Sequence, residues 1–174
     1  MTAPHTPHLL LLFAALLPNA LACQLPRSLP GHSLQLLRTM ALNSTHTCQQ
    51  QQSPFFPDAL RHNNRSQQDQ HTALAILHNL LHTLSSNHIP QQWDNHARHH
   101  LLNSLHQHTH HLQQCLTHNT TLLQGQDVRI TRYFRHIHRF LNANDHSDCA
   151  WQHVYLEARL CFQHLHNITS NTIN

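Results

Sequence analysis

Histidine is the side chain in this sequence with the most obvious chemical potential, with 23 copies among 174 residues. His96 and His100, and again His106 and His110, are four residues apart, which places two imidazoles on one face of a helix. Such pairs can bind Zn²⁺ or Cu²⁺. No HExxH motif or cysteine partner completes a ligand set. We therefore interpret these histidines as solvent-facing helix residues and predict no metal site and no cofactor.

Carboxylates are too few and too scattered for acid–base catalysis. The chain has one glutamate, Glu157, and six aspartates, most of which fall in expected turns or at expected helix starts. No two of them share a productive spacing on a core-facing stripe. No GxSxG or catalytic cysteine sequence accompanies the histidines. The sequence therefore predicts that the protein is not an enzyme.

The charge pattern argues against nucleic-acid binding. Charged residues make up only 10% of the chain, the formal net charge is +3, and all ten cations are arginines scattered along the sequence. Nucleic-acid binding usually requires a dense basic patch. We predict no nucleic-acid partner.

Residues 1–22 are predicted to form a secretory signal peptide. Leu9 to Leu17 is an apolar run too short to span a bilayer, and Ala20-Leu21-Ala22 supplies small residues at the cleavage positions. Two alternatives remain open, an N-terminal membrane anchor and a bacterial lipoprotein site with an acylated Cys23. The mature domain is expected to span residues 23–174, to be extracellular and not to insert into a membrane.

Secretion determines how the cysteines and the glycosylation motifs are interpreted. An oxidising compartment favours disulfides, but five cysteines leave one unpaired and allow fifteen pairings, so spacing alone does not choose. No CxxC spacing occurs, which argues against a compact zinc site.

Four Asn-X-Ser/Thr motifs predict N-glycosylation at helix ends or in loops, where a glycan reaches solvent. Their asparagines are Asn43, Asn64, Asn119 and Asn167.

The elements that must position these residues are helices. Glycine occurs twice and β-branched runs are missing, so strands and hairpins have little support. Apolar residues recur at spacings of three and four, which predicts helices. The expected ranges are 34–41, entered after Pro30-Gly31, then 73–84, 93–116, 127–141 and 151–168, the last with Trp151, Val154, Ala158, Cys161, Leu165 and Ile168 on one apolar stripe.

Long irregular segments between these helices favour one architecture. Residues 44–69 are polar and without period, which predicts a crossover loop, with Phe55, Phe56 and Leu60 apolar enough to pack onto the bundle. Residues 117–126 form a second irregular segment, and 142–147 a turn. We therefore predict an all-α fold, a five-helix up-up-down-down bundle of the helical cytokine class with a long first crossover loop.

Residues 130–162, ITRYFRHIHRFLNANDHSDCAWQHVYLEARLCF, carry a more specific pattern. A helix with a Tyr-Phe and aliphatic stripe is followed by a short turn and then by Cys149-Ala150-Trp151 at the start of the last helix. This pattern resembles the type I interferon family, in particular its non-mammalian (avian or reptilian-like) members. The resemblance extends to SLQLLRTM from Ser33, FPDAL from Phe56, TALAILHNLLHTLSS from Thr72 and WDNHARHHLLNSLHQHTHHLQQC from Trp93.

The resemblance implies a disulfide framework. It pairs Cys23 with Cys115 and Cys48 with Cys149, which leaves Cys161 as the free thiol. Cys161 lies twelve residues beyond Cys149, or about 18 Å along a straight helix, so these two cannot be bridged.

The resemblance also implies a function. It predicts a secreted, monomeric interferon that brings together the two chains of the type I interferon receptor and triggers JAK-STAT antiviral signalling. In relatives, one receptor chain binds the first helix, its adjoining loop and the last helix, and the other binds the second, third and fourth helices. The implied receptor-binding residues are Arg38, Gln49, Gln52, Tyr155 and Arg159. The alternative is a secreted His-rich metal-binding helical glycoprotein.

Overall fold

The computed structural model describes residues 25–41, 48, 55–57, 66–117 and 128–171. It contains α1 (Ser28–Met40), α2 (Ser66–Leu84), α3 (Asn95–Thr117), α4 (Val128–Ala143) and α5 (Asp148–Asn171). No strand occurs within these ranges, and none of the helices described is long and apolar enough to cross a membrane. The predicted signal peptide and its two alternatives lie outside the described residues.

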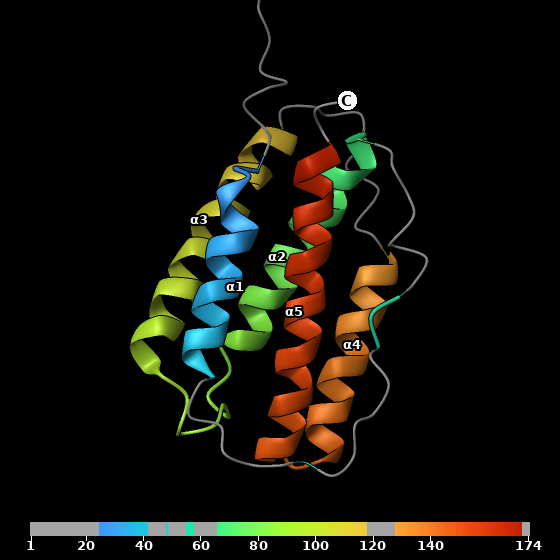
Figure 1. Cartoon of the computed structure of the whole chain (residues 1–174). Helices are drawn as coiled ribbons and strands as arrows, with labels where there is room; N and C mark the ends of the chain where they lie inside the picture. Colours follow the sequence, from blue (N-terminus) through green and yellow to red (C-terminus); the bar gives the residue numbers. More distant parts are fainter. Residues whose placement is uncertain (1–24, 42–47, 49–54, 58–65, 118–127, 172–174) are drawn as a thin grey trace, which may run out of the picture.

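The helices form an up-up-down-down bundle with one additional helix. Figure 1 shows α1 and α2 running in one direction and α3 and α5 in the other. α2 contacts α3, α4 and α5, while α1 packs on α3 and α5. α4 is the additional helix, and it lies antiparallel to α5 at the edge of the bundle. The predicted all-α architecture of five helices is confirmed for the described residues.

Three helix starts were predicted wrongly. α1 begins at Ser28 and not after Pro30-Gly31. Proline is tolerated in the first turn of a helix, because the backbone N–H that it lacks would have no helical partner there and because the fixed φ of proline suits a helix. α2 begins at Ser66, so the predicted loop to Asp69 was too long. Its first turn is polar and therefore has no apolar period to reveal it. Trp93 is buried but precedes α3.

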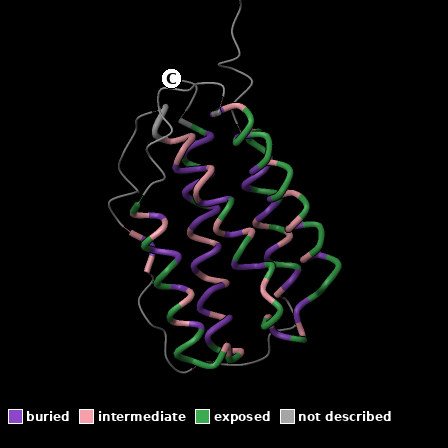
Figure 2. Tube along the Cα trace, turned by 180° about the vertical axis from the view of Figure 1, so that it is seen from behind, coloured by how far each residue is buried: buried purple, intermediate pink, exposed green. Residues whose placement is uncertain are grey.

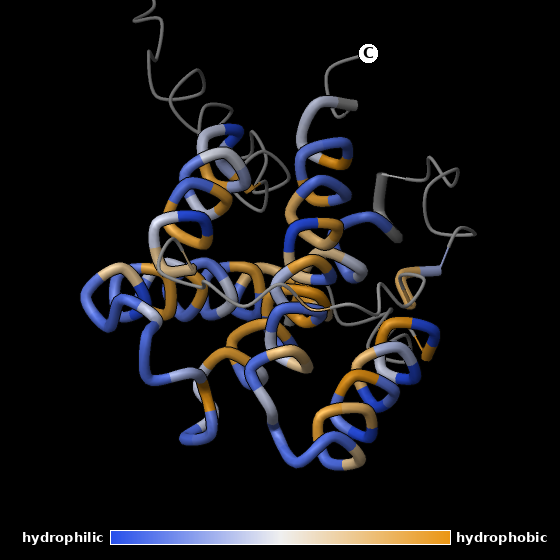
Figure 3. Tube along the Cα trace, turned by 60° about the horizontal axis from the view of Figure 1, so that its bottom comes forward, coloured by the Kyte–Doolittle hydropathy of each residue, from blue (hydrophilic) through white to orange (hydrophobic). Residues whose placement is uncertain are grey.

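The core follows the predicted apolar stripes. Leu37 of α1, Ile76 of α2, Leu101 of α3, Ile130 of α4 and Leu165 of α5 are fully buried. Figure 2 shows buried residues repeating along the helices, and Figure 3 shows hydrophobic positions alternating with hydrophilic ones on each helix. Spacings of three and four residues thus place one side of every helix in a shared core.

The lower end of the bundle is held by polar contacts between helix ends. Asp94 accepts a hydrogen bond from the Ala97 N–H at 2.6 Å, which caps α3, and the Asp94 N–H donates to the Met40 carbonyl at 2.9 Å. The Arg98 guanidinium donates to the carbonyls of Leu84 at 3.0 Å and Ser86 at 2.8 Å. These contacts satisfy carbonyls at the ends of α1 and α2 that have no partner within their own helix.

The turn between α4 and α5 is tight. Asp145 and His146 both have positive φ, at 49° and 52°, a conformation that Asp and His adopt more readily than β-branched residues. The His146 N–H donates to the Leu141 carbonyl at 2.9 Å. Ser147 then caps α5 by accepting from the Ala150 N–H at 3.4 Å. This turn sets α5 antiparallel to α4 within the predicted segment 142–147.

Candidate functional site

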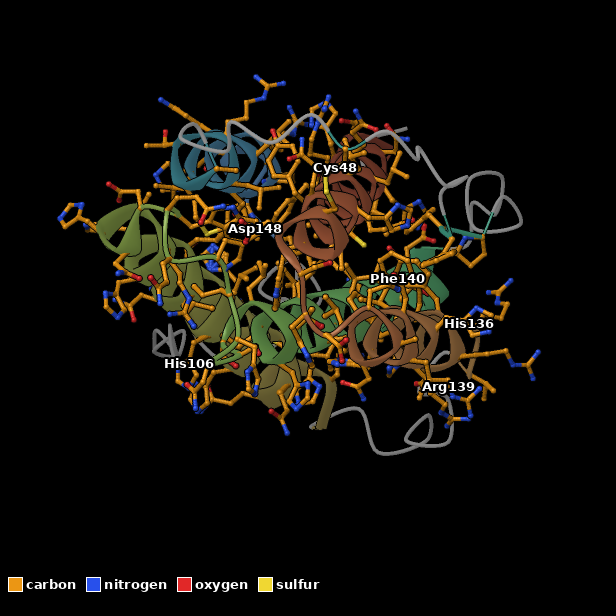
Figure 4. The ribbon with its side chains drawn as sticks, turned by 90° about the horizontal axis from the view of Figure 1, so that it is seen from below. Cys48, His106, His136, Arg139, Phe140 and Asp148 are labelled. Atoms are coloured by element: carbon orange, nitrogen blue, oxygen red, sulfur yellow. A yellow bond between two sulfur atoms is a disulfide. The ribbon has the colours of Figure 1, made fainter. Side chains whose placement is uncertain are left out.

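A disulfide ties the segment between α1 and α2 to the start of α5. Cys48 and Cys149 are bonded with an S–S distance of 2.05 Å and a Cα–Cα distance of 5.6 Å. Because α1 and α2 run in the same direction, the end of α1 and the start of α2 lie at opposite ends of the bundle (Figure 1). The bond fixes Cys48 beside the lower end of α5, where Figure 4 labels it.

A buried carboxylate holds the same segment further along. Glu157 on α5 is 1% exposed, and its Oε1 accepts a hydrogen bond from the Phe55 N–H at 2.5 Å. Its Oε2 accepts from the Tyr133 hydroxyl of α4 at 2.9 Å, and Nε2 of His153 lies 3.1 Å from Oε1. One side chain thus joins α4, α5 and the crossover segment.

Ring packing surrounds this polar contact. Phe55 lies against His136, Phe140 and His153, with ring centroids 6.1, 5.5 and 4.7 Å away. Phe56 is buried against Tyr133, at 5.4 Å, and His164, at 5.5 Å. Phe55 and Phe56 therefore pack onto the bundle as expected, whereas Leu60 lies outside the described residues.

The structural role of Glu157 was not predicted from the sequence, in which this residue stands out only as a lone carboxylate unsuited to catalysis. Glu157 is three residues after Val154 and four before Cys161, so its position on the apolar stripe was visible in the sequence. A charged residue type on a core stripe indicates a buried polar contact, because burial without hydrogen bonds is costly.

Replacing Glu157 with alanine should loosen the crossover segment. The Phe55 N–H and the buried Tyr133 hydroxyl would lose their acceptor, and an unsatisfied buried donor costs about 1 to 3 kcal/mol. We expect Glu157→Ala to lower the free energy of unfolding by about 2 to 4 kcal/mol in urea titrations and to speed amide hydrogen exchange at Phe55. Glu157→Gln, which keeps the volume and one acceptor oxygen, should cost less. Unchanged exchange at Phe55 in the alanine variant would contradict this role.

Tyr133 and Cys161 are chemically inert in this environment. Burial, with the neighbouring Cys161 thiol and Glu157 carboxylate, raises the pKa of Tyr133 far above its usual range, so the phenol remains protonated. Burial raises the pKa of Cys161 to about 12. Since the thiolate is the reactive form, the fully buried Cys161 is a packing residue, 3.5 Å from the Tyr133 hydroxyl. It forms no disulfide in the structure.

The outward surface of α1 and α5 contains the described candidates for partner binding. Tyr155 and Arg159 are half-exposed on α5, and Arg38 is exposed near the end of α1. The Arg159 guanidinium carbon lies 5.9 Å from the Tyr155 ring centroid, within cation–π range. α1 and α5 pack together in opposite directions, so Arg38 and Tyr155 belong to the same half of the bundle. We call Arg38, Tyr155 and Arg159 the α1/α5 face.

Several predicted site residues lie outside the described part of the chain. These are Gln49, Gln52, Cys23, Asn43, Asn64 and Asn119. Cys115 is half-buried near the end of α3, with its sulfur 4.0 Å from the His111 Nε2, and its pairing with Cys23 stays a prediction. Asn167 is exposed within α5, four residues before the helix ends.

The histidine pairs adopt the predicted spacing. Nε2 atoms of His96 and His100 are 3.3 Å apart, while the rings of His106 and His110 stack with centroids 6.4 Å apart. Among the described residues no three His, Cys, Asp or Glu side chains are placed to hold a metal ion. Two imidazoles are fewer than the four ligands typical of a structural zinc site.

A further histidine cluster joins α2 to the α4–α5 turn. The His138 ring lies 5.2 Å from that of His82, and its Nε2 is 3.3 Å from the Thr83 hydroxyl. Burial, together with His82 and His146, lowers the pKa of His138. This imidazole therefore favours the neutral form and serves as a packing and hydrogen-bonding group.

The topology, with its tethered crossover segment, is that of the helical cytokine fold. Solved structures agree: the chain superposes on zebrafish interferon 1 with a TM-score of 0.72 and 22% identity, covering 83% of this chain and 94% of that one. The chain belongs to the interferon alpha/beta family, whose domain model matches residues 24–172.

Relatives of known sequence support the same assignment. Chicken interferon type A1/A2 is 39% identical over 174 residues, covering 94% of this chain and 90% of the relative. Chicken interferon type B is 42% identical over 139 residues, covering 76% and 68%. The family resemblance is confirmed. Interferons are cytokines and not enzymes, which agrees with the prediction from the sequence.

Proposed function

We propose that this chain is a secreted type I interferon, which binds a two-chain cell-surface receptor and triggers JAK-STAT antiviral signalling. The main support is the family match across residues 24–172, the whole helical domain. The mature protein acts as a monomer, and its signal peptide, residues 1–22, directs secretion. N-glycans are carried at Asn43, Asn64, Asn119 and Asn167.

Conditioned medium tests this function. Cells of the source lineage are treated with medium containing the secreted chain and then infected. We expect protection from virus and phosphorylation of STAT proteins, both blocked by an inhibitor of the receptor-associated kinases. Secreted, folded protein that gives neither response would overturn the proposal.

The α1/α5 face is proposed to bind one receptor chain, and Gln49 and Gln52 are proposed to take part in the same binding. Arg and Tyr are frequent interface anchors. The cation–π contact of Arg159 with Tyr155 already orders both side chains, which reduces the entropy lost on binding. A carboxylate or carbonyl of the receptor chain would supply acceptors for this guanidinium.

Tyr155→Ala and Arg159→Ala should each weaken binding to that receptor chain by about 1 to 3 kcal/mol. Both side chains are half-exposed, so melting temperature and circular dichroism should stay near those of the parent chain. Surface plasmon resonance against each receptor ectodomain measures the effect. Gln107→Ala on the exposed side of α3 is the matched control and should bind this receptor chain normally. Full affinity of both α5 variants for both ectodomains would exclude this face.

The second receptor chain is proposed to bind outward surfaces of α2, α3 and α4.

The metal-binding alternative has only the two histidine pairs in its favour. Zinc retained at low micromolar concentration after dialysis would support it, and we expect no such retention.

A further inference from the structure

The solvent side of α4 carries an unusual concentration of positive charge. Four of the ten arginines in the chain, Arg129, Arg132, Arg135 and Arg139, lie in this 16-residue helix, which contains no acidic residue. His136 adds a fifth basic side chain. The scatter of arginines along the sequence therefore conceals a local cluster in space.

Helical geometry places these side chains in one row. At about 100° per residue, the buried residues Ile130, Tyr133, Phe134, Ile137 and Leu141 occupy one side of α4. Arg132, Arg135 and Arg139 follow one another at spacings of three and four on the opposite side, and all three are exposed. Figure 4 shows His136 and Arg139 pointing away from the bundle. We call Arg132, Arg135, His136 and Arg139 the α4 basic row, which spans about 10 Å of helix.

The charges of this row are not neutralised by the described residues. Arg132, Arg135 and Arg139 form no ion pair or hydrogen bond with any of them. Arg98 shows the contrast, because its guanidinium is committed to the carbonyls of Leu84 and Ser86. Like charges at spacings of three and four on a helix are destabilising, so the row weakens the fold slightly, and no ion pair with a described residue offsets this.

We propose that the α4 basic row binds a linear sulfated polysaccharide of the cell surface or extracellular matrix. A planar guanidinium can donate two parallel hydrogen bonds to an oxyanion, and successive arginines match successive sulfates along a chain. The proposal rests on the proposed function in one respect: the protein must be secreted to meet such a polysaccharide.

Other partners fit the row less well. Single-stranded nucleic acids usually stack on exposed aromatic side chains beside the basic groups. In α4, however, Tyr133 and Phe134 are buried, and Phe140 packs against Phe55. Protein interfaces are usually centred on buried apolar or aromatic anchors. The row itself offers none, because Val128 at the helix start is the only exposed large hydrophobic side chain of the described residues. A receptor chain that reaches α4 would therefore find its anchors outside the row.

Binding to immobilised heparin, measured as a function of salt, tests the proposal. Two variants are compared that each lower the net charge by two: Arg132→Gln/Arg139→Gln in the row and Arg27→Glu at the start of α1, where the arginine is also exposed. Each cationic side chain removed from a complex with a polyanion lowers the slope of log K against log salt by about one. We expect the slope to fall by about two for the row variant and to stay near the parent value for the α1 variant. Arg132→Lys/Arg139→Lys should largely restore it.

Several outcomes would overturn the inference. These are absence of heparin binding by the parent chain at physiological salt, an equal fall of the slope in the row variant and the α1 variant, and equally tight binding of single-stranded DNA. Loss of affinity for a receptor ectodomain with unchanged heparin binding would assign the row to the receptor instead. Circular dichroism verifies that each variant is folded. Heparin binding without an antiviral response would contradict the proposed function alone.

Discussion

Val154→Asp should abolish the native fold. Val154 is 2% exposed on the core stripe of α5, and burying an unpaired carboxyl group there costs several kcal/mol even if it takes up a proton. The new carboxyl would also lie three residues from Glu157, on the same side of the helix. The combined loss, about 4 kcal/mol or more, approaches the total stability of an ordinary domain, which is about 5 to 15 kcal/mol.

Thermal melting followed by circular dichroism measures this effect. We expect the variant to lack a cooperative transition, or to melt far below the parent chain. Gln163→Asp is the matched control, because it introduces the same group at an exposed position of the same helix and should melt normally. A Val154→Asp chain as stable as this control would show that α5 does not face the core as described.

Removing the disulfide between Cys48 and Cys149 should have a comparable effect. The bond joins residues 101 positions apart. For a closed loop of that size the chain-entropy model gives about 4 to 5 kcal/mol of stabilisation. We expect Cys48→Ser/Cys149→Ser to lower the free energy of unfolding by about this amount in urea titrations, while the helical circular dichroism signal below the transition remains.

Cys161→Ala is the comparison for the disulfide variant. It removes a sulfur atom that takes no part in the bond, and its effect is a local packing loss. A disulfide variant that loses less than about 1 kcal/mol would indicate that the denatured chain already keeps these residues close, and that the bond does not hold the crossover in place.

The sequence predicted the helices well wherever an apolar period was strong. α5 is the clearest case, since Trp151, Val154, Ala158, Cys161 and Leu165 are all buried as the stripe requires. The prediction failed at the starts of α1 and α2. There the deciding features were proline in a first turn and a polar first turn, and neither produces a periodic signal.

The candidate site was less predictable, because it depends on contacts between distant segments. No local pattern relates Phe55 to Glu157, which is 102 residues away, so only the fold reveals the carboxylate that anchors the crossover. The α4 basic row was hidden for a different reason. The arginines are separated along the chain by apolar residues, and only the helix collects them on one side.

The central claim is that this protein bridges two receptor chains. Its most direct test is light scattering coupled to size exclusion, with purified residues 23–174 mixed with the ectodomains of both type I interferon receptor chains from the source lineage. We predict a single complex that contains one copy of each component, and loss of one ectodomain when Tyr155 and Arg159 are both alanine. Failure of the folded parent chain to bind either ectodomain would contradict the account.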